Sequence, residues 1–147
     1  MAANRRLLMG GVDLVKTRLK NAGTAMVAVC DELDPILEES DFFLNAPFQS
    51  VSLILRYGLI NNTDPEYQPI DQRHRELPIS VEIDAKLLQS LDRSDPNGLK
   101  DVVSLVAAAA LLNVSVKFGL ASDALRRKKE YLIERLGPIA RELNLSN

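Results

Sequence analysis

Four carboxylates recur at helical spacing in the first third of the chain. They stand at positions i, i+3, i+7 and i+10 and would share one side of a helix beside its apolar face: Asp31, Asp34, Glu38 and Asp41. No basic residue lies four positions from any of them, so their charges are not offset within the helix. Such a group could bind a divalent cation, supply an acid and a base, or attract a basic partner, and a solvated surface is the simplest interpretation.

Metal binding and catalysis both fit the residues poorly. The glycine-containing calcium loop is missing, and a regular helix seldom brings more than two carboxylates to one ion. Cys30 lies on an apolar stripe between Met26 and Leu33, where a thiol is expected to be packed rather than reactive. His74 lies in a polar connection with no nucleophile pattern near it. We therefore expect no catalytic, cofactor-binding or metal site, and a protein that is not an enzyme.

Charge is distributed unevenly along the 147 residues. The chain has 18 basic and 20 acidic residues, but residues 24–71 alone carry nine acidic side chains and one basic side chain. Aromatic residues make up 5% and tryptophan is absent, which argues against a nucleic-acid binder. The basic run over residues 126–129 points in several directions on a helix and is expected to be solvated. A basic protein is the partner that this pattern favours.

The carboxylates are expected on the second of two N-terminal helices. Apolar periodicity predicts a first helix over residues 8–19 that Gly23 terminates, and a second helix that begins after an N-cap at Thr24. Gly10 and Gly11 are expected to let helices pack closely. Pro35 lies inside the second pattern, so either that helix kinks there or a new turn begins after Asp34.

Further along, the apolar period changes to two residues. Alternation over residues 51–59 and 77–84 predicts strands, although a helix over residues 48–57 competes for the first of them. Residues 67–70 can add a short edge strand. We expect a small antiparallel sheet of two or three strands within residues 50–84.

The remaining residues are predicted to be helical. Asp84 can cap a helix over residues 85–91, a central buried helix is expected over residues 99–118, and Gly119 ends it. Ser122 or Asp123 begins a last helix that Gly137 and Pro138 should bend or break. The predicted fold is one mostly helical α+β domain over residues 1–147, with about five helices around helix 99–118. The apolar run over residues 102–112 is about half a membrane span, so neither a membrane segment nor a targeting signal is expected.

One segment resembles a known family. Tyr67-Gln68-Pro69-Ile70, a polar turn and then the run from Glu76-Leu77-Pro78 to Asp84 are similar to the central segment of immunity proteins from bacterial polymorphic toxin systems. The similarity covers about 20 residues. It implies a cytoplasmic antidote that binds and neutralises a cognate toxin domain.

The resemblance gives the acidic surface a specific partner. Toxins that attack nucleic acids or nucleotides usually have basic clefts, to which a negatively charged antidote can bind quickly. The residues expected to contact the toxin are Asp31, Asp34, Glu38, Asp41, Asp64, Glu66, Glu82 and Asp84. The alternative is a structural or adaptor module that self-associates through an apolar helix face, and a homo-oligomer fits that alternative. Phe42, Phe43, Leu44 and Phe48 could supply an exposed anchor in either case or form a buried cluster.

Overall fold

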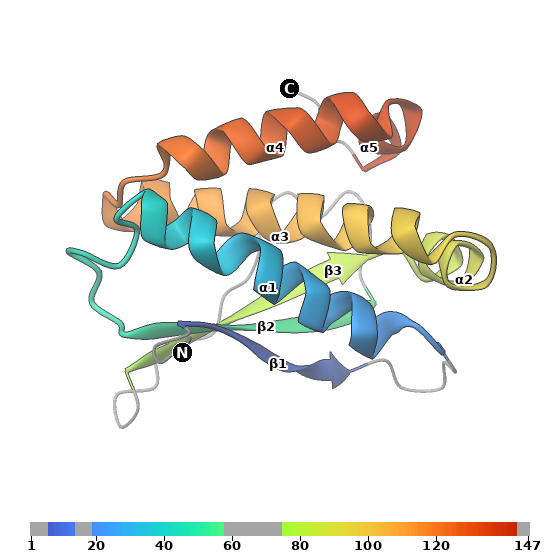
Figure 1. Ribbon diagram of the computed structural model, residues 1–147. Coiled ribbons are helices and arrows are strands. Elements are labelled where there is room, and N and C mark those ends of the chain that lie inside the picture. The colour runs from blue at the N-terminus through green and yellow to red at the C-terminus, as the bar shows by residue number, and fades with distance from the viewer. Residues whose placement is uncertain (1–5, 14–18, 58–74, 144–147) are drawn as a thin grey trace.

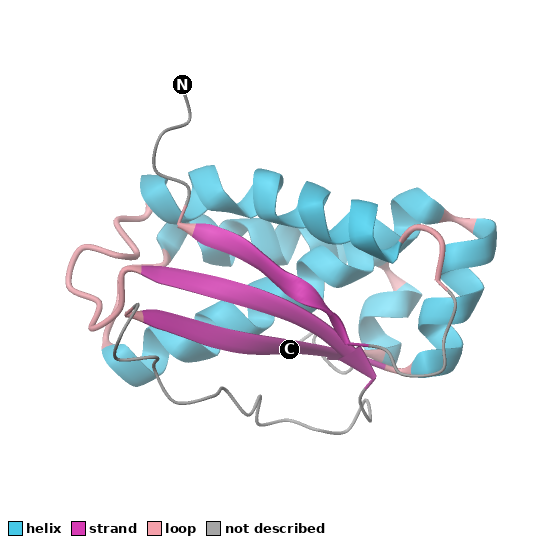
Figure 2. Ribbon diagram, turned by 90° about the horizontal axis from the view of Figure 1, so that it is seen from below, coloured by secondary structure: helices cyan, strands magenta, loops and turns pink. Residues whose placement is uncertain are grey.

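The fold is a small sheet covered by helices on one face. The computed structural model describes residues 6–13, 19–57 and 75–143 (Figure 1). Its elements follow in the order β1 (Leu7–Asp13), α1 (Ala22–Glu39), β2 (Ser50–Tyr57), β3 (Glu76–Ile83), α2 (Ala85–Ser94), α3 (Pro96–Phe118), α4 (Asp123–Leu136) and α5 (Pro138–Glu142). Helices α1 and α3 lie on the sheet, and α4 lies above them as an outer layer. On the opposite face of the sheet no described helix is present (Figure 2).

The sheet is parallel, so the predicted antiparallel arrangement was wrong. The strand order is β1-β2-β3, with Leu53 of β2 paired to Met9 on one side and to Ile79 on the other. Alternation correctly predicted β2 and β3, and the competing helix over residues 48–57 is not formed. Alternation tells which side chains share a face but carries no information on strand direction. The additional strand predicted at residues 67–70 lies outside the described residues.

Residues 7–13 form a strand, where a helix was expected. Gly10 explains much of the difference, because a Cβ atom there would lie 2.9 Å from Ile54 Cγ1 and 3.2 Å from the carbonyl oxygen of Leu53. The glycine therefore permits close approach within the sheet rather than between helices. A register shift between Met9 and Gly11 interrupts the alternation that would have marked the strand.

Helix α1 begins earlier than predicted and is not interrupted. It includes Gly23 and Thr24, so the predicted stop and N-cap at these positions were wrong. A distant carboxylate replaces the local cap: Asp92 of α2 accepts hydrogen bonds from the backbone amides of Lys20 at 2.8 Å and Asn21 at 2.7 Å. Pro35 lies inside α1 without ending it, so no new turn starts after Asp34.

The later helices follow the sequence pattern, but α2 continues to Ser94 rather than Leu91 and α3 begins at Pro96 rather than Leu99. Pro96 takes the first helical position, where a missing amide costs nothing, so α3 starts within the gap that was expected between the two helices.

Asp84 caps α2 by accepting from the Leu87 amide at 3.2 Å, and Gly119 ends α3 in the left-handed conformation. Gly137, with φ of 58°, separates α4 from α5. The described residues thus contain five helices, but not the predicted five: the first became β1 and the last is divided into two.

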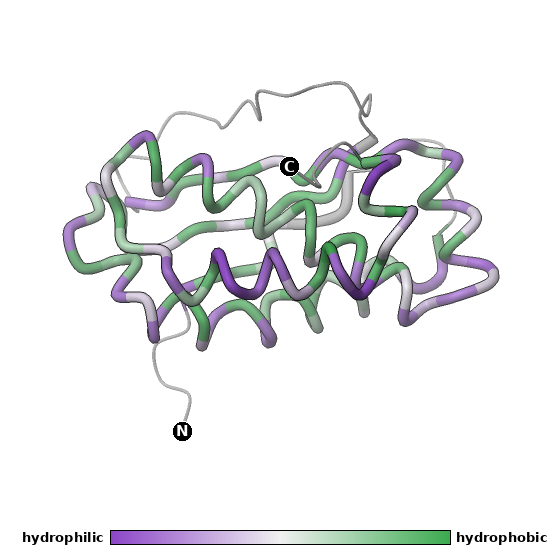
Figure 3. The backbone as a smooth tube through the Cα atoms, turned by 90° about the horizontal axis from the view of Figure 1, so that it is seen from above, coloured by the Kyte–Doolittle hydropathy of each residue, from purple (hydrophilic) through white to green (hydrophobic). Residues whose placement is uncertain are grey.

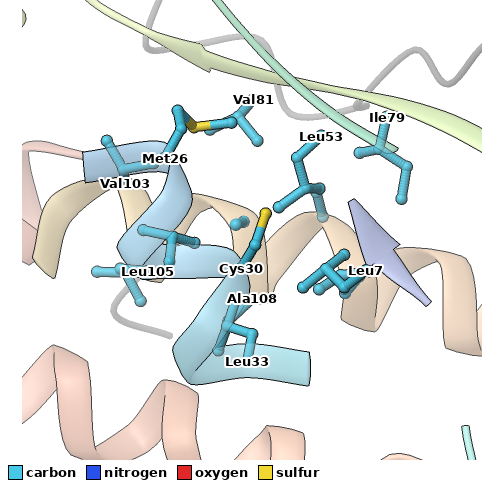
Figure 4. Packing of buried hydrophobic residues seen from close by; sticks show 14 of the residues in the cluster. Leu7, Met26, Cys30, Leu33, Leu53, Ile79, Val81, Val103, Leu105 and Ala108 are labelled. Atoms are coloured by element: carbon cyan, nitrogen blue, oxygen red, sulfur yellow. The ribbon is translucent and has the colours of Figure 1, made fainter. Parts of the chain in front are cut away.

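Helix α3 is the central buried helix, as predicted. By length and composition it could cross a membrane, but 72% of its most apolar 18-residue window is buried inside the protein. The hydropathy colouring of Figure 3 contrasts apolar α3 with amphipathic α4. Leucines, valines and alanines of α1, α3 and the strands form one hydrophobic cluster (Figure 4).

Candidate functional site

The acidic residues of α1 face in different directions. Glu32 points to the seam between α1, α3 and α4, where it forms ion pairs with both Lys100 and Lys128. Glu39 lies 3.9 Å from Arg127 of α4. Both therefore point away from the four carboxylates singled out by spacing, as the helical arrangement predicts.

The seam holds Glu32 in its charged form. Partial burial opposes ionisation, but the hydrogen bonds and charges of Lys100 and Lys128 outweigh it and hold the Glu32 pKa below its ordinary value. The hydrogen bond to Glu32 raises the pKa of Lys100, against the effect of burial. In the same seam Asp101 accepts a hydrogen bond from Arg135 at 2.8 Å. These carboxylates join helices that are far apart in sequence, which is a structural role.

Asp34 is also occupied. Its Oδ1 atom accepts hydrogen bonds from the backbone amides of Arg6 at 3.1 Å and Leu7 at 2.8 Å. It thereby connects the start of β1 to the middle of α1. Because this carboxylate satisfies two main-chain donors, a charge reversal at Asp34 would disturb the fold before it reported on any partner.

Glu38 and Asp41 are exposed at the C-terminal end of α1. Neither forms an ion pair with another residue in the part of the chain that the structure describes. Asp41 adopts φ of 57°, its amide donates to the Glu38 carbonyl at 3.1 Å, and the Phe42 amide donates to the Leu37 carbonyl at 3.0 Å. This is a Schellman ending in which an aspartate occupies the position usually taken by glycine. Asp31 is exposed nearer the middle of the helix.

A small open pocket of about 100 Å³ adjoins the carboxylates of Glu38 and Asp41. Arg6 lies at its edge with its guanidinium carbon 5.3 Å from the centre of the Phe43 ring. The pocket is lined by Arg6, Leu37, Glu38, Asp41, Phe42, Phe43 and Leu44. The lining is thus mixed: apolar side chains, two carboxylates and one guanidinium.

The aromatic residues beside the pocket are mostly buried. Phe42, Phe43 and Phe48 are 0%, 7% and 2% exposed, with ring centres 5.1 to 6.3 Å apart, so they form the buried cluster that was one of the two predictions. Leu44 is the exception, because 73% of it is exposed. The phenylalanines fix the turn, and Leu44 alone of this group is available as an anchor.

Two further predicted contact residues, Glu82 and Asp84, do not join this surface. Glu82 lies near the end of β3 and Asp84 follows it as the cap of α2, whereas the end of α1 lies beside the start of β1. Because the strands are parallel, these places are at opposite ends of the sheet, and eight residues of strand span roughly 23 Å. Asp64 and Glu66 lie outside the described residues. Of the eight predicted residues, the six that the structure describes therefore do not share one surface.

Comparison with known families decides the class of the protein. The chain matches the family described as Immunity protein 39 over residues 1–130. It belongs to the Immunity protein 39 family. The match extends far beyond the 20 residues that first suggested an immunity protein, and it includes α1 and the pocket at its end. No curated protein and no solved structure matches the chain.

The thiol of this immunity protein does not line the pocket. Cys30 is buried in the core, as predicted (Figure 4). His74 lies outside the described residues. In residues 6–13, 19–57 and 75–143 no three His, Cys, Asp or Glu side chains gather as a metal site would require. The structural carboxylates Asp92 and Asp101 were missed from the sequence, because their partners lie on other elements.

Proposed function

We propose that this immunity protein binds and neutralises a cognate toxin domain in the cytoplasm, using the acidic end of α1 against a basic surface of the toxin. The residues that make the contact are Glu38 and Asp41, with Asp31 about two turns nearer the N-terminus of α1. Family membership supports the toxin as partner. The exposure of both carboxylates, and their lack of ion pairs with described residues, supports the place of contact.

The observation that carries this proposal is the unfavourable charge at the end of α1. A helix C-terminus has a partial negative charge that basic side chains normally offset. The last turn of α1 has no basic residue and contains Glu38 and Glu39, and Asp41 follows directly after the C-cap Ser40. Asp41 in addition adopts a backbone conformation that glycine tolerates better. Departures from local rules of this kind are expected where a residue serves binding rather than stability.

Binding alone accounts for the proposed activity. Exposed carboxylates attract a basic surface over a distance and so speed association, which suits an antidote that must reach its toxin before damage occurs. Inhibition is then stoichiometric, with one immunity protein bound to each toxin domain. The family is in general non-enzymatic, in agreement with this mechanism.

Co-expression tests the proposal. The C-terminal domain of the protein encoded directly upstream of this protein's gene is the candidate toxin, and it is expressed from an inducible promoter with and without the immunity protein. We expect growth to be restored and the two chains to purify as a one-to-one complex. If the immunity protein is folded and abundant but neither protects nor binds, the proposed function is wrong.

The structure does not favour self-association through an apolar helix face. The large apolar side chains that the described residues expose lie on separate elements or loops: Met9, Val27, Leu44, Val116 and Tyr131. Single exposed apolar residues are ordinary on a protein surface and do not form a dimer interface. Light scattering after size exclusion is expected to give the mass of a monomer, and a stable dimer that leaves the toxin unbound would favour the adaptor alternative.

A further inference from the structure

The turn that follows α1 presents one apolar side chain from a rigid support. Leu44 is 73% exposed, while its neighbours Phe42 and Phe43 are buried in the aromatic cluster. The same cluster extends through Phe48 to Phe118 of α3, with ring centres 5.6 Å apart. Leu44 is therefore attached to the core by the residues on its N-terminal side.

Hydrogen bonds also fix the backbone of the turn around Leu44. The Leu44 amide donates to the Asp41 carbonyl at 3.1 Å, and the Ala46 amide donates to the Phe43 carbonyl at 3.3 Å. The hydroxyl of Ser40 accepts from the Ala124 amide at 3.2 Å and so connects the end of α1 to α4. Because the backbone of this turn is already ordered, binding through Leu44 costs the conformational entropy of the side chain only, which favours its use as an anchor.

We propose that Leu44 is the apolar anchor of the toxin interface and inserts into an apolar recess of the toxin that basic side chains border. This inference rests on the proposed function and specifies its contact surface. Glu38 and Asp41 line the same pocket as Leu44, so they would face the basic border of that recess. An apolar core residue with a polar, solvent-accessible rim is the usual organisation of a protein–protein interface.

Exposure alone does not distinguish Leu44. Val116 of α3 is 80% exposed, but it does not line the pocket beside the two carboxylates. The two residues therefore form a matched pair. Substitution of either by serine removes an exposed apolar side chain without a change in charge, and only the substitution at Leu44 should affect binding.

The test measures dissociation of the immunity protein from the purified candidate toxin domain used in the co-expression experiment. We expect Leu44→Ser to raise the dissociation rate by about 10-fold to 30-fold, with Leu44→Met close to wild type and Val116→Ser within about threefold. Circular dichroism and thermal unfolding establish that each variant is folded. We expect all of them to fold, because both side chains are largely exposed.

The outcomes separate the two proposals. If wild type binds and Leu44→Ser dissociates no faster than Val116→Ser, the anchor is wrong while the proposed function stands. If Leu44→Met dissociates as fast as Leu44→Ser, an apolar side chain is not what the toxin recognises, and the anchor is again wrong. If wild type itself does not bind, the proposed function fails and the anchor with it.

Discussion

Carboxylates at the two ends of α1 have opposite effects on the stability of the helix. At its N-terminal end Asp92, only 5% exposed, accepts two backbone hydrogen bonds and places negative charge where the helix dipole favours it. At its C-terminal end Glu38 and Asp41 place negative charge where the dipole disfavours it, and they have no ion pair among the described residues. The carboxylate at the N-terminal end thus stabilises the fold, whereas the carboxylates at the C-terminal end lower its stability. We therefore assign the C-terminal end to binding.

Removal of the buried cap should have the largest effect. Asp92→Ala leaves the amides of Lys20 and Asn21 without their acceptor, so we expect a loss of about 2–3 kcal/mol in the free energy of unfolding. Urea titration measures it. Toxin affinity of the folded fraction should be unchanged, and a loss below about 0.5 kcal/mol would show that the tertiary cap does not hold this end of α1.

The middle of α1 should show an intermediate effect. Glu32→Gln leaves Lys100 and Lys128 facing each other without the shared carboxylate. Because the site is partly exposed and screened, we expect a loss of about 1 kcal/mol that diminishes at high salt. Chemical unfolding in low and high salt measures both quantities. Equal losses at the two salt concentrations would contradict an ionic role for Glu32.

Acid should weaken the same seam. Because the folded-state pKa of Glu32 lies below its ordinary value of 4.5, its ionised form contributes stability above pH 4.5. That contribution is lost as the pH falls through the folded-state pKa. Unfolding free energies measured between pH 7 and pH 3 should therefore decrease less for Glu32→Gln than for wild type. Parallel pH curves for the two proteins would exclude this linkage.

A gain in stability is expected at the other end of the helix. Asp41→Gly relieves the positive φ and removes a carboxylate from the helix C-terminus, so it should stabilise the fold by about 0.5–1 kcal/mol. The same change should slow association with the toxin. Thermal unfolding and binding kinetics on one sample measure both effects, and destabilisation would mean that the Asp41 side chain supports the fold.

Local patterns in the sequence were enough for the C-terminal half. Caps such as Asp84 and the stop at Gly119 lie within a few residues of the helix ends that they define, so these ends are visible in sequence. Strand β1 was not visible, because its partner Val51 lies some forty residues further along and Gly10 is explained only by contact with Ile54. Whether two strands pair in parallel likewise depends on the path of the chain between them, which alternation in the sequence does not reveal.

The candidate site was predictable only in part. Spacing placed Asp31, Asp34, Glu38 and Asp41 on one side of a helix, but α1 ends at Glu39, so Asp41 lies in the turn beyond the helix. Spacing also could not show that Asp34 would accept hydrogen bonds from the backbone of β1. The pairing of Glu32 with Lys100 and Lys128 depends on helix packing and has no local signal. Glu38 and Asp41 are therefore the candidates that remain, because other carboxylates of this segment bind parts of the fold.

The most direct test compares two charge-matched double variants. Glu38→Gln with Asp41→Asn removes two carboxylates from the end of α1, and asparagine tolerates the positive φ. Glu130→Gln with Glu134→Gln removes two exposed carboxylates from α4. Stability of both should stay within about 0.5 kcal/mol of wild type. At low salt the first should associate with the toxin domain about tenfold more slowly, with the second close to wild type. Equal association rates for the two variants would contradict the assignment of the α1 end as the toxin-binding surface.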